Sequence, residues 1–492
     1  MLKELIGSKR PDIPGKEELK AKLKEERKKL SDSQMKIKAA RLPVMVIFEG
    51  WGGSGKGRMI GKVIYNLDPR FFQVATMDAK PTDAEKRRPF LYRYMIEIPE
   101  QGHFKFFDTC WMEAVTNELL IGNKSEETFK TRIKEINIAE RQLKDNGYVL
   151  VKFFMHIDKK EQNRRLTALK VNKDTKWRVN SDDDWENKHY DKCLEVYDEY
   201  LENTHRPYAP WYIIDASNKD FAEFQVLSYL NQAISTALTN SALAVPILQN
   251  TFPLVSMPKL EEVDLNKTIS TEDYKQQLKL LQGRLSELHN KLYRKKVPVI
   301  ICYEGWDAAG KGGNIKRVTE ALDARGYVVC PVASPEPHEK ARHYLWRFWE
   351  KLPKTGHVTI FDRTWYGRVM VERLEGFCTE NEWQRAYNEI NEFEKMLTDW
   401  GAVVVKFWVQ IDKDTQLERF TERQNTPEKQ WKITDEDWRN RDKWDLYEGA
   451  VNEMLQKTST TYAPWYILES NDKKYARIKA LKTLITAIEE KL

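Results

Sequence analysis

Cysteine is scarce in this sequence, with five residues among 492, and no two of them form a Cys-x-x-Cys pair. The five are also an odd number: Cys110, Cys193, Cys302, Cys330 and Cys378. A disulfide scaffold or a zinc site is therefore not expected, and a reducing compartment is the default. The first residues, MLKELIGSKRPDIP, lack the apolar run of a secretory signal. We therefore expect a cytoplasmic protein.

An apolar run suited to a membrane is also missing. Residues 224–258 carry no charge, but amides and prolines interrupt them, among them Asn231, Gln232, Asn240, Pro246, Gln249, Asn250 and Pro253. Such residues are unsuited to a bilayer core. The stretch predicts a packed helix followed by an apolar linker, and no membrane association. It could also pack between domains or subunits, so a homo-oligomer stays open.

A strong charge of one sign is absent too. Lys and Arg number 81 and Asp and Glu number 75, so the formal net charge is +6. This excludes a strongly basic nucleic-acid coat protein and an acidic disordered chain, but not a local basic patch. Hydrophobic residues make up 41% and charged residues 32%, as in an ordinary globular protein.

What the sequence does contain is a long internal repeat. Glu49-Gly50-Trp51 recurs as Glu304-Gly305-Trp306, and Ala209-Pro210-Trp211-Tyr212 recurs as Ala463-Pro464-Trp465-Tyr466. The offset stays at 254 or 255 positions over some 160 residues. Length alone would favour about three domains, but the repeat predicts two copies of one. We predict domains at 1–240 and 269–492, joined by a linker at 241–268.

Each copy has the same predicted order of elements. A charged helix (16–40; 271–296) precedes an apolar strand (44–48; 297–303), a Gly-rich turn and a helix. A second strand ends at Asp108 or Asp362, a third spans 148–157 or 402–411, and the last spans 211–214 or 465–468. Short apolar runs alternating with long helices predict a parallel sheet covered on both faces, an α/β three-layer fold.

The turn after the first strand has the pattern of a phosphate loop. Gly305-Trp-Asp-Ala-Ala-Gly310-Lys311 fits GxxxxGK, and Gly50-Trp-Gly-Gly-Ser-Gly55-Lys56 matches it in the first copy. Glycines let backbone N–H groups surround phosphate oxygens, and the lysine reaches the phosphates. A turn used only for close helix–strand packing is the alternative, and it stays open for the first copy.

The residue after the lysine is Gly312 or Gly57, where a Ser or Thr usually binds Mg²⁺. Another oxygen must then hold the metal. Asp307 in the loop and Asp362 at the end of its strand are the predicted pair, because Mg²⁺ prefers a few carboxylates with phosphate oxygens. The alternative for Asp307 is a cap on the following helix.

Cations gather near the same sheet edge. Arg363 and Arg368 follow Asp362, and a later helical stretch carries Arg419, Arg423, Lys432, Arg439 and Arg441 among tryptophans. Such a stretch is often a solvated face. After the third strand, however, it has the place of a mobile lid whose arginines offset the charge of a transferring phosphoryl group.

At these residues the sequence resembles the polyphosphate kinase 2 family, whose P-loop fold is similar to thymidylate kinase. Residues 305–313 resemble its Walker A motif, residues 361–368 its Walker B motif and residues 422–447 its lid. The resemblance covers nearly all of both halves. It implies a three-layer P-loop kinase fold, a parallel sheet with a helical lid, duplicated in tandem.

The resemblance also implies phosphoryl transfer between polyphosphate and a nucleotide, with Mg²⁺ as cofactor and Mn²⁺ as a substitute. A tandem chain resembles class II, which implies transfer to AMP to give ADP. The predicted catalytic residues are Asp307, Lys311, Asp362 and Arg363, with Asp307 and Asp362 as metal ligands. The predicted phosphate- or nucleotide-binding residues are Gly305, Gly310, Gly312, Gly313, Arg368, Arg419, Arg423, Lys432 and Arg441.

The first half departs from this pattern. Asp307, Arg363, Arg368, Arg423 and Arg441 align with Gly52, Thr109, Ala114, Leu169 and Lys188. Loss of the loop carboxylate and of these arginines should remove metal positioning and charge stabilisation. We therefore predict one active domain, the second, while the first is structural or binds phosphate chains without reacting.

Three other functions remain open. An ATP-dependent nucleoside monophosphate kinase would use ATP and not polyphosphate. A polyphosphate-binding protein would bind without turnover. A single-stranded nucleic-acid binder could use the Trp- and Arg-rich lid, although the small net charge disfavours it, and no nucleic-acid partner is expected.

Overall fold

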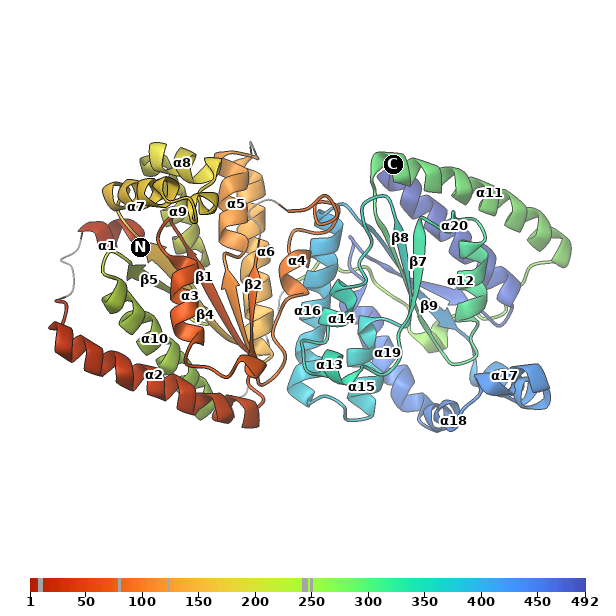
Figure 1. Ribbon diagram of the computed structural model, residues 1–492. Helices are drawn as coiled ribbons and strands as arrows, with labels where there is room; N and C mark the ends of the chain where they lie inside the picture. The colour runs from red at the N-terminus through yellow and green to blue at the C-terminus, as the bar shows by residue number, and fades with distance from the viewer. Residues whose placement is uncertain (8–11, 78–80, 123, 241–246, 248–250) are drawn as a thin grey trace. The chain divides into compact units, whose positions relative to one another are not determined.

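The computed structural model describes residues 1–7, 12–77, 81–122, 124–240, 247 and 251–492. The chain forms two compact units (Figure 1). Unit 1 comprises Met1–Thr82, Phe90–Ala244 and Lys340–His343, and unit 2 comprises Asp83–Pro89, Val245–Glu339 and Tyr344–Leu492.

The first half of the chain contains these elements: α1 (Leu2–Gly7), α2 (Lys16–Ala39), β1 (Val44–Gly50), α3 (Lys56–Ile64), η1 (Pro69–Phe71), β2 (Phe72–Thr76), α4 (Tyr92–Met95), β3 (Phe104–Asp108), α5 (Trp111–Leu120), α6 (Glu126–Asp145), β4 (Val149–His156), α7 (Lys159–Val171), η2 (Lys176–Arg178), α8 (Ser181–Lys188), α9 (Tyr190–Thr204), β5 (Trp211–Asp215) and α10 (Lys219–Asn240).

The second half repeats most of them: η3 (Leu260–Glu262), α11 (Thr271–Lys295), β6 (Val299–Gly305), α12 (Lys311–Thr319), β7 (Tyr327–Pro331), α13 (Pro337–Lys340), α14 (Trp346–Trp349), β8 (Val358–Asp362), η4 (Trp365–Val369), α15 (Val371–Leu374), α16 (Glu380–Asp399), β9 (Val403–Gln410), α17 (Lys413–Asn425), η5 (Pro427–Lys432), α18 (Asp435–Asp442), α19 (Trp444–Thr458), β10 (Trp465–Glu469) and α20 (Lys473–Lys491).

Each unit is built on a five-stranded parallel sheet. The strand orders are β2-β3-β1-β4-β5 and β7-β8-β6-β9-β10, which are the same order. The central strands β1 and β6 are buried along their length up to the terminal glycine, as unbroken apolar runs predict for strands covered on both faces. The phosphate-loop strand therefore lies at the middle of each sheet, with its carboxyl end between two neighbours.

Helices cover both faces of each sheet. In unit 1, α3 and α10 pack on one face, α2 packs on α10, and α5, α6 and α9 pack together on the other face. In unit 2, α12 and α20 cover one face with α11 against α20, and α16 lies on the other with α19 against it (Figure 1). This confirms the predicted α/β three-layer fold, duplicated in tandem.

A buried ion pair is repeated in the two cores. Lys152 of β4 donates to Glu140 of α6 at 2.6 Å, and Lys406 of β9 donates to Glu394 of α16 at 2.7 Å. All four side chains are fully buried. Each lysine also donates to a helix-end carbonyl, Thr204 or Thr458. A paired, hydrogen-bonded charge is the form in which a buried lysine is tolerated.

The charged helices predicted at 16–40 and 271–296 are confirmed as α2 and α11. The helix predicted within 224–258 is confirmed as the second part of α10, where Val226, Leu227, Leu230 and Ile234 are buried. Much of the predicted linker, residues 241–246 and 248–250, lies outside the described residues. One strand of each sheet, β2 or β7, was not predicted, because most residues of these short edge strands are exposed or only partly buried.

Candidate active site

The phosphate loop of unit 2 joins β6 to α12. Gly305 has a φ of +148°, and an added Cβ would lie 2.5 Å from the Val409 carbonyl oxygen, so only glycine fits. Gly310 occupies the N-cap of α12 in a left-handed conformation. The Lys311 ammonium donates to the Gly305 and Trp306 carbonyl oxygens at 2.6 and 3.1 Å. Loop, lysine and helix N-terminus thus meet as phosphate binding requires.

Helix α17 contacts this loop through the side chain of Arg419. The Arg419 guanidinium donates to four main-chain carbonyl oxygens, those of Ala308, Ala309, Ser470 and Asn471, at 2.6–3.1 Å. Ala308 has a left-handed φ of +62°, an unfavourable conformation for alanine. Burial, with the charge of Arg423, lowers the pKa of Arg419 to about 10. Arg419 therefore positions the loop, whereas the sequence predicted a phosphate ligand in the lid.

The Asp307 carboxylate lies inside the loop and is only 15% exposed. Its oxygens accept hydrogen bonds from Arg363 and from Asn440 of α18, both at 3.1 Å. Burial alone would raise the pKa of Asp307, but the charges of Lys311 and Arg363 and the Asn440 hydrogen bond lower it below its ordinary value. Asp307 is therefore ionised at neutral pH. The helix N-cap is Gly310 and no side chain caps it, so Asp307 does not act as a cap.

Asp362 ends β8, the strand next to β6, and pairs in register with Tyr303. Arg363 follows it with a φ of +67°, and its side chain turns to Asp307. The two predicted metal ligands thus come from the carboxyl ends of neighbouring strands, and Arg363 links them. Thr109, the equivalent of Arg363 in unit 1, has a φ of +69°. The backbone turn is therefore a property of the fold, while the charge belongs to unit 2.

Glu304 supports this turn and was not identified from the sequence. Its buried carboxylate accepts from the Thr364 backbone N–H and hydroxyl, both at 2.7 Å. Burial raises the pKa of Glu304 to about 7, against the hydrogen bonds from Thr364 and the charge of Lys311. In unit 1, Glu49 likewise accepts from the Cys110 and Met112 backbone N–H groups. The repeated Glu-Gly-Trp motif was the available signal.

The neighbouring Trp306 was also missed. Its ring stacks on Trp444 of α19, with centroids 3.7 Å apart. In unit 1, Trp51 stacks on Tyr190 with centroids 4.0 Å apart. This stack ties the loop to the helix that follows the lid in both units.

Two predicted arginines are engaged away from the loop carboxylate. Arg368 pairs with Glu372 at 3.0 Å and lies over the Tyr344 ring, 4.5 Å from its centroid. Arg441 donates to the Lys413 carbonyl at 2.5 Å and to the Gln416 side chain at 3.2 Å. Since Gln416 in turn donates to the Asp307 carbonyl at 3.1 Å, Arg441 reaches the loop through one intermediate.

The remaining predicted residues divide into three groups. Arg423 lies on α17, where its charge contributes to the lowered pKa of Arg419. Gly312 faces open space, and Gly313 faces the Arg477 guanidinium. The side chain of Lys432 lies outside the described residues.

One predicted correspondence between the two halves is wrong by a residue. Both lid helices begin with a capping box, Asn180 with Asp183 and Thr434 with Asp437. These caps align Arg441 with Asn187, not with Lys188. Asn187 makes the matching contacts, donating to the Lys159 carbonyl and to Gln162. Trp185 and Trp438 lie 253 residues apart and the caps 254, so an alignment on the tryptophans shifts this helix by one residue.

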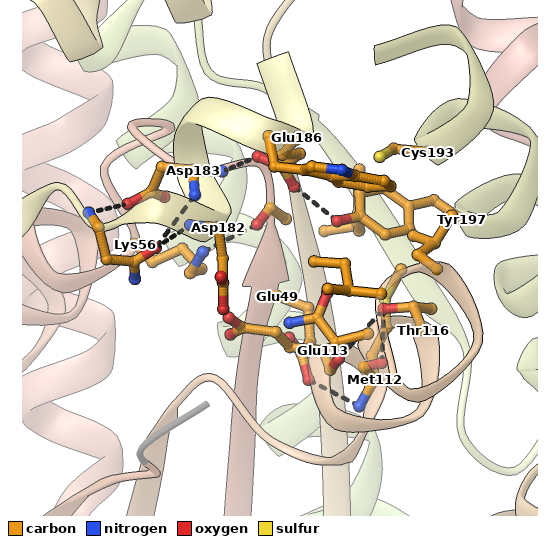
Figure 2. Close-up of a pocket in the computed structure, with 18 residues that line it drawn as sticks. Glu49, Lys56, Met112, Glu113, Thr116, Asp182, Asp183, Glu186, Cys193 and Tyr197 are labelled. Carbon is orange, nitrogen blue, oxygen red and sulfur yellow. Dashed lines mark hydrogen bonds between the residues drawn. The ribbon is translucent and has the colours of Figure 1, made fainter. Parts of the chain in front are cut away.

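Figure 2 shows the pocket at the equivalent place in unit 1, where Asp183, Glu186, Glu49 and Glu113 lie near Lys56. The Lys56 ammonium donates to the Gly50 carbonyl at 2.8 Å, as Lys311 does to Gly305. Burial raises the pKa of Glu49 to about 8 and that of Glu186 to about 7. The lysine is retained, but carboxyl groups line the pocket around it, and the equivalents of the unit 2 arginines are uncharged residues such as Thr109 and Ala114.

Glu186 binds the phosphate loop of unit 1 directly. Its carboxylate accepts from the Gly52 backbone N–H at 2.9 Å, from the Gln162 amide at 2.5 Å and from the Tyr197 hydroxyl at 2.5 Å. In unit 2 the same lid position is Asn440, which donates to Asp307. The Glu186 carboxylate therefore accepts a hydrogen bond from a loop N–H group of the kind that binds phosphate in such loops.

None of the helices among the described residues is long and apolar enough to cross a membrane. Three or more His, Cys, Asp or Glu side chains that could hold a metal ion do not gather anywhere in that part of the chain. A metal at Asp307 and Asp362 would therefore need further oxygens from substrate or water.

A parallel sheet with order β7-β8-β6-β9-β10, a glycine-bounded phosphate loop after its central strand and a carboxylate at the end of the next strand define a P-loop kinase fold, present twice. Residues 14–242 and 268–492 match the family described as polyphosphate kinase 2 (PPK2). The chain belongs to this family.

Several relatives are similar over nearly their whole length. A polyphosphate:AMP phosphotransferase of Pseudomonas aeruginosa is 40% identical over 468 residues, which cover 94% of each chain. One of Acinetobacter johnsonii is 36% identical over 91% of each chain. A crystal structure assigned to polyphosphate kinase 2 of Pseudomonas aeruginosa matches with a TM-score of 0.85 and 37% identity over 99% of both chains.

Proposed function

We propose that unit 2 transfers a phosphoryl group from inorganic polyphosphate to AMP, giving ADP and a shortened chain. The observation that carries this is similarity over 94% of both chains to a relative named polyphosphate:AMP phosphotransferase. The loop, lysine, carboxylates and arginines of unit 2 supply the groups that such a transfer needs.

The chain's own residues bind and orient the two phosphates. The loop amides and Lys311 hold the donor phosphoryl group at the N-terminus of α12. Arg363 and the more distant cations Arg368 and Arg423 offset the repulsion between two polyanions. Because the phosphate of AMP is already an anion near neutral pH, no strong general base is needed. Closure of the lid helices keeps water from the phosphoryl group.

Asp307 and Asp362 fit Mg²⁺ by the chemistry of their donor atoms. Both offer hard carboxylate oxygens, and the lowered pKa of Asp307 keeps it ionised. With few protein ligands, the ion would keep waters and bind phosphate oxygens, as Mg²⁺ prefers, and Mn²⁺ would substitute. When bound, the metal supplies positive charge between donor and acceptor phosphates.

We propose that unit 1 does not react. Supporting this, Gly52 replaces Asp307, and Glu186 accepts a hydrogen bond from the loop amide that would face a phosphate. Domain limits of 1–240 and 269–492, a cytoplasmic location, a homo-oligomer and the lack of a nucleic-acid partner all stay predictions from the sequence.

The test is a product assay. The full chain is incubated with Mg²⁺, long-chain polyphosphate and each nucleoside mono- or diphosphate, and in parallel with ATP and AMP, and products are separated by anion exchange. We expect ADP from AMP and polyphosphate, and none after chelation of the metal. Turnover with ATP but not polyphosphate would identify a nucleoside monophosphate kinase instead, and binding without product would indicate a polyphosphate carrier.

A further inference from the structure

The start of α20 places two cations against the phosphate loop of unit 2. An added Cβ on Gly313, in the first turn of α12, would lie 2.9 Å from the Arg477 guanidinium. An added Cβ on Gly310 would lie 3.9 Å from the Lys473 side chain. Lys473 and Arg477 are four residues apart on one helix and so point to the same side. The sequence had assigned no role to either of them.

These cations form a like-charged group. Burial and the positive charges of Arg419, Arg477 and Arg423 lower the pKa of Lys473, against the charge of Glu422. Within the described part of the chain, neither Lys473 nor Arg477 forms an ion pair with a carboxylate. The Arg477 guanidinium donates to the Tyr274 hydroxyl at 3.5 Å, and its buried Nε has no hydrogen-bond partner among the described residues. Around Lys473, three arginines face one acidic neighbour, Glu422, and this excess of positive charge favours the binding of an anion.

Unit 1 lacks this group of charges. At an offset of 254 residues, Arg477 corresponds to Glu223 and Arg423 to Leu169, while Lys473 corresponds to Lys219. Glu223 is buried and pairs with Arg27 of α2. Arg477 is therefore not required by the fold, since a paired carboxylate takes its place in the other unit.

We propose that Lys473 and Arg477, together with Arg423, form a subsite for the polyphosphate chain beyond the phosphoryl group held by the loop. This rests on the proposed function. One helical turn, about 5.4 Å, separates the two α20 cations, a spacing that would let both contact one chain of repeating phosphates. The subsite raises affinity for long chains and leaves AMP binding unchanged.

The test combines equilibrium binding with kinetics on the full chain. For Arg477→Glu, which introduces the residue type of unit 1, and Arg477→Gln, binding of long-chain polyphosphate is measured by calorimetry without nucleotide. We expect the Kd to rise about 10-fold or more for Arg477→Glu and less for Arg477→Gln. The KM for long-chain polyphosphate should rise in parallel, with less effect on tripolyphosphate. The KM for AMP should stay within about 2-fold.

Lys482→Glu is the matched control, because Lys482 is exposed on the same helix and makes the same charge change. It should leave the Kd for polyphosphate within about 2-fold. Unchanged binding in both Arg477 variants, or a rise in the KM for AMP alone, would overturn the subsite. Absence of polyphosphate turnover in the unmodified protein would refute the proposed function, while the binding comparison would still decide the subsite. Thermal unfolding of each variant separates loss of binding from loss of fold.

Discussion

At the scale of single residues, Asp307 carries the sharpest prediction. Asp307→Asn keeps the size and planar shape of the side chain, but it replaces one accepting oxygen by a donor and removes a charge that Lys311 and Arg363 stabilise. We expect ADP formation to fall at least about 100-fold, the magnitude seen when one electrostatic group is removed from such a site. Steady-state rates at saturating AMP and polyphosphate measure it. Asp323→Asn, the same exchange at an exposed Arg325 pair, should keep full activity.

Residue types and spacing predicted which groups gather at the loop, but not how each is used. Asp307, Lys311 and Arg363 lie together, as the motifs indicated. Arg419 looked equivalent to the other lid arginines, because helical spacing shows which residues share a face and not which guanidinium is buried against main-chain carbonyls. Lys473 and Arg477 come from the last helix, which has no phosphate motif, so only the three-dimensional structure brings them to the loop.

At the scale of elements, the duplicated anchor between α7 or α17 and the phosphate loop allows a paired prediction. Arg419 and its counterpart Arg165 both donate to loop and strand-end carbonyls. Replacing either by Gln leaves buried carbonyl groups without partners and should destabilise its unit by roughly 2–4 kcal/mol.

Arg419→Gln should also lower kcat at least about 10-fold, because the loop loses its position, whereas Arg165→Gln should leave kcat unchanged. Calorimetric unfolding and steady-state rates together check this pair. Equal loss of activity in the two variants would argue against a purely structural first unit.

Glu186 of α8, which binds the phosphate loop of unit 1, predicts that the stability of this unit depends on pH. Burial raises the pKa of Glu186 to about 7, against the hydrogen bonds from Tyr197 and Gly52. An acid whose pKa is higher in the folded state binds more protons there, so its contribution to stability falls as pH rises from about 4.5 to 7. Glu186→Gln removes this pH-dependent contribution to stability, because glutamine does not titrate.

The difference in unfolding free energy between Glu186→Gln and the unmodified protein should therefore shift in favour of the variant from pH 5 to pH 8. The shift should reach on the order of 2–3 kcal/mol at most. Thermal unfolding at both pH values measures it. A difference that does not change with pH would mean that Glu186 is ionised throughout.

Which elements form was largely readable from the sequence. Unbroken apolar runs predicted the central strands, and dense Glu and Lys pairs predicted α2 and α11. The edge strands β2 and β7 were missed, because a strand with one paired side needs no continuous apolar run. The one-residue error in α18 arose because a tryptophan was aligned, whereas the helix is fixed by its N-terminal capping box.

At the scale of the whole molecule, the two units should contribute unequally to turnover. Lys311→Ala should lower ADP formation at least about 100-fold, because the lysine reaches the donor phosphates. Lys56→Ala, the same exchange at the matching position of unit 1, should leave kcat and KM within about 2-fold. A large loss in a Lys56→Ala variant that unfolds at the normal temperature would contradict the single-site proposal.

The duplication itself was fully visible in the sequence, since an offset that stays at 254 or 255 positions has no other simple origin. How the two phosphate loops differ was only partly visible in the sequence. Missing arginines suggested an inactive first half, but the carboxylate of Glu186 on the loop amide depends on how α8 packs, which spacing does not reveal.

The space around Gly52 limits which substitutions the phosphate loop of unit 1 can accept. A Cβ at this position would overlap the Asp183 carboxylate and come within 3.1 Å of Glu186. An aspartate at this position would thus bring a third carboxylate against those of Asp183 and Glu186. A single substitution would therefore not recreate the loop of unit 2. A loop like that of unit 2 would therefore need changes at Asp183 and Glu186 as well as at Gly52.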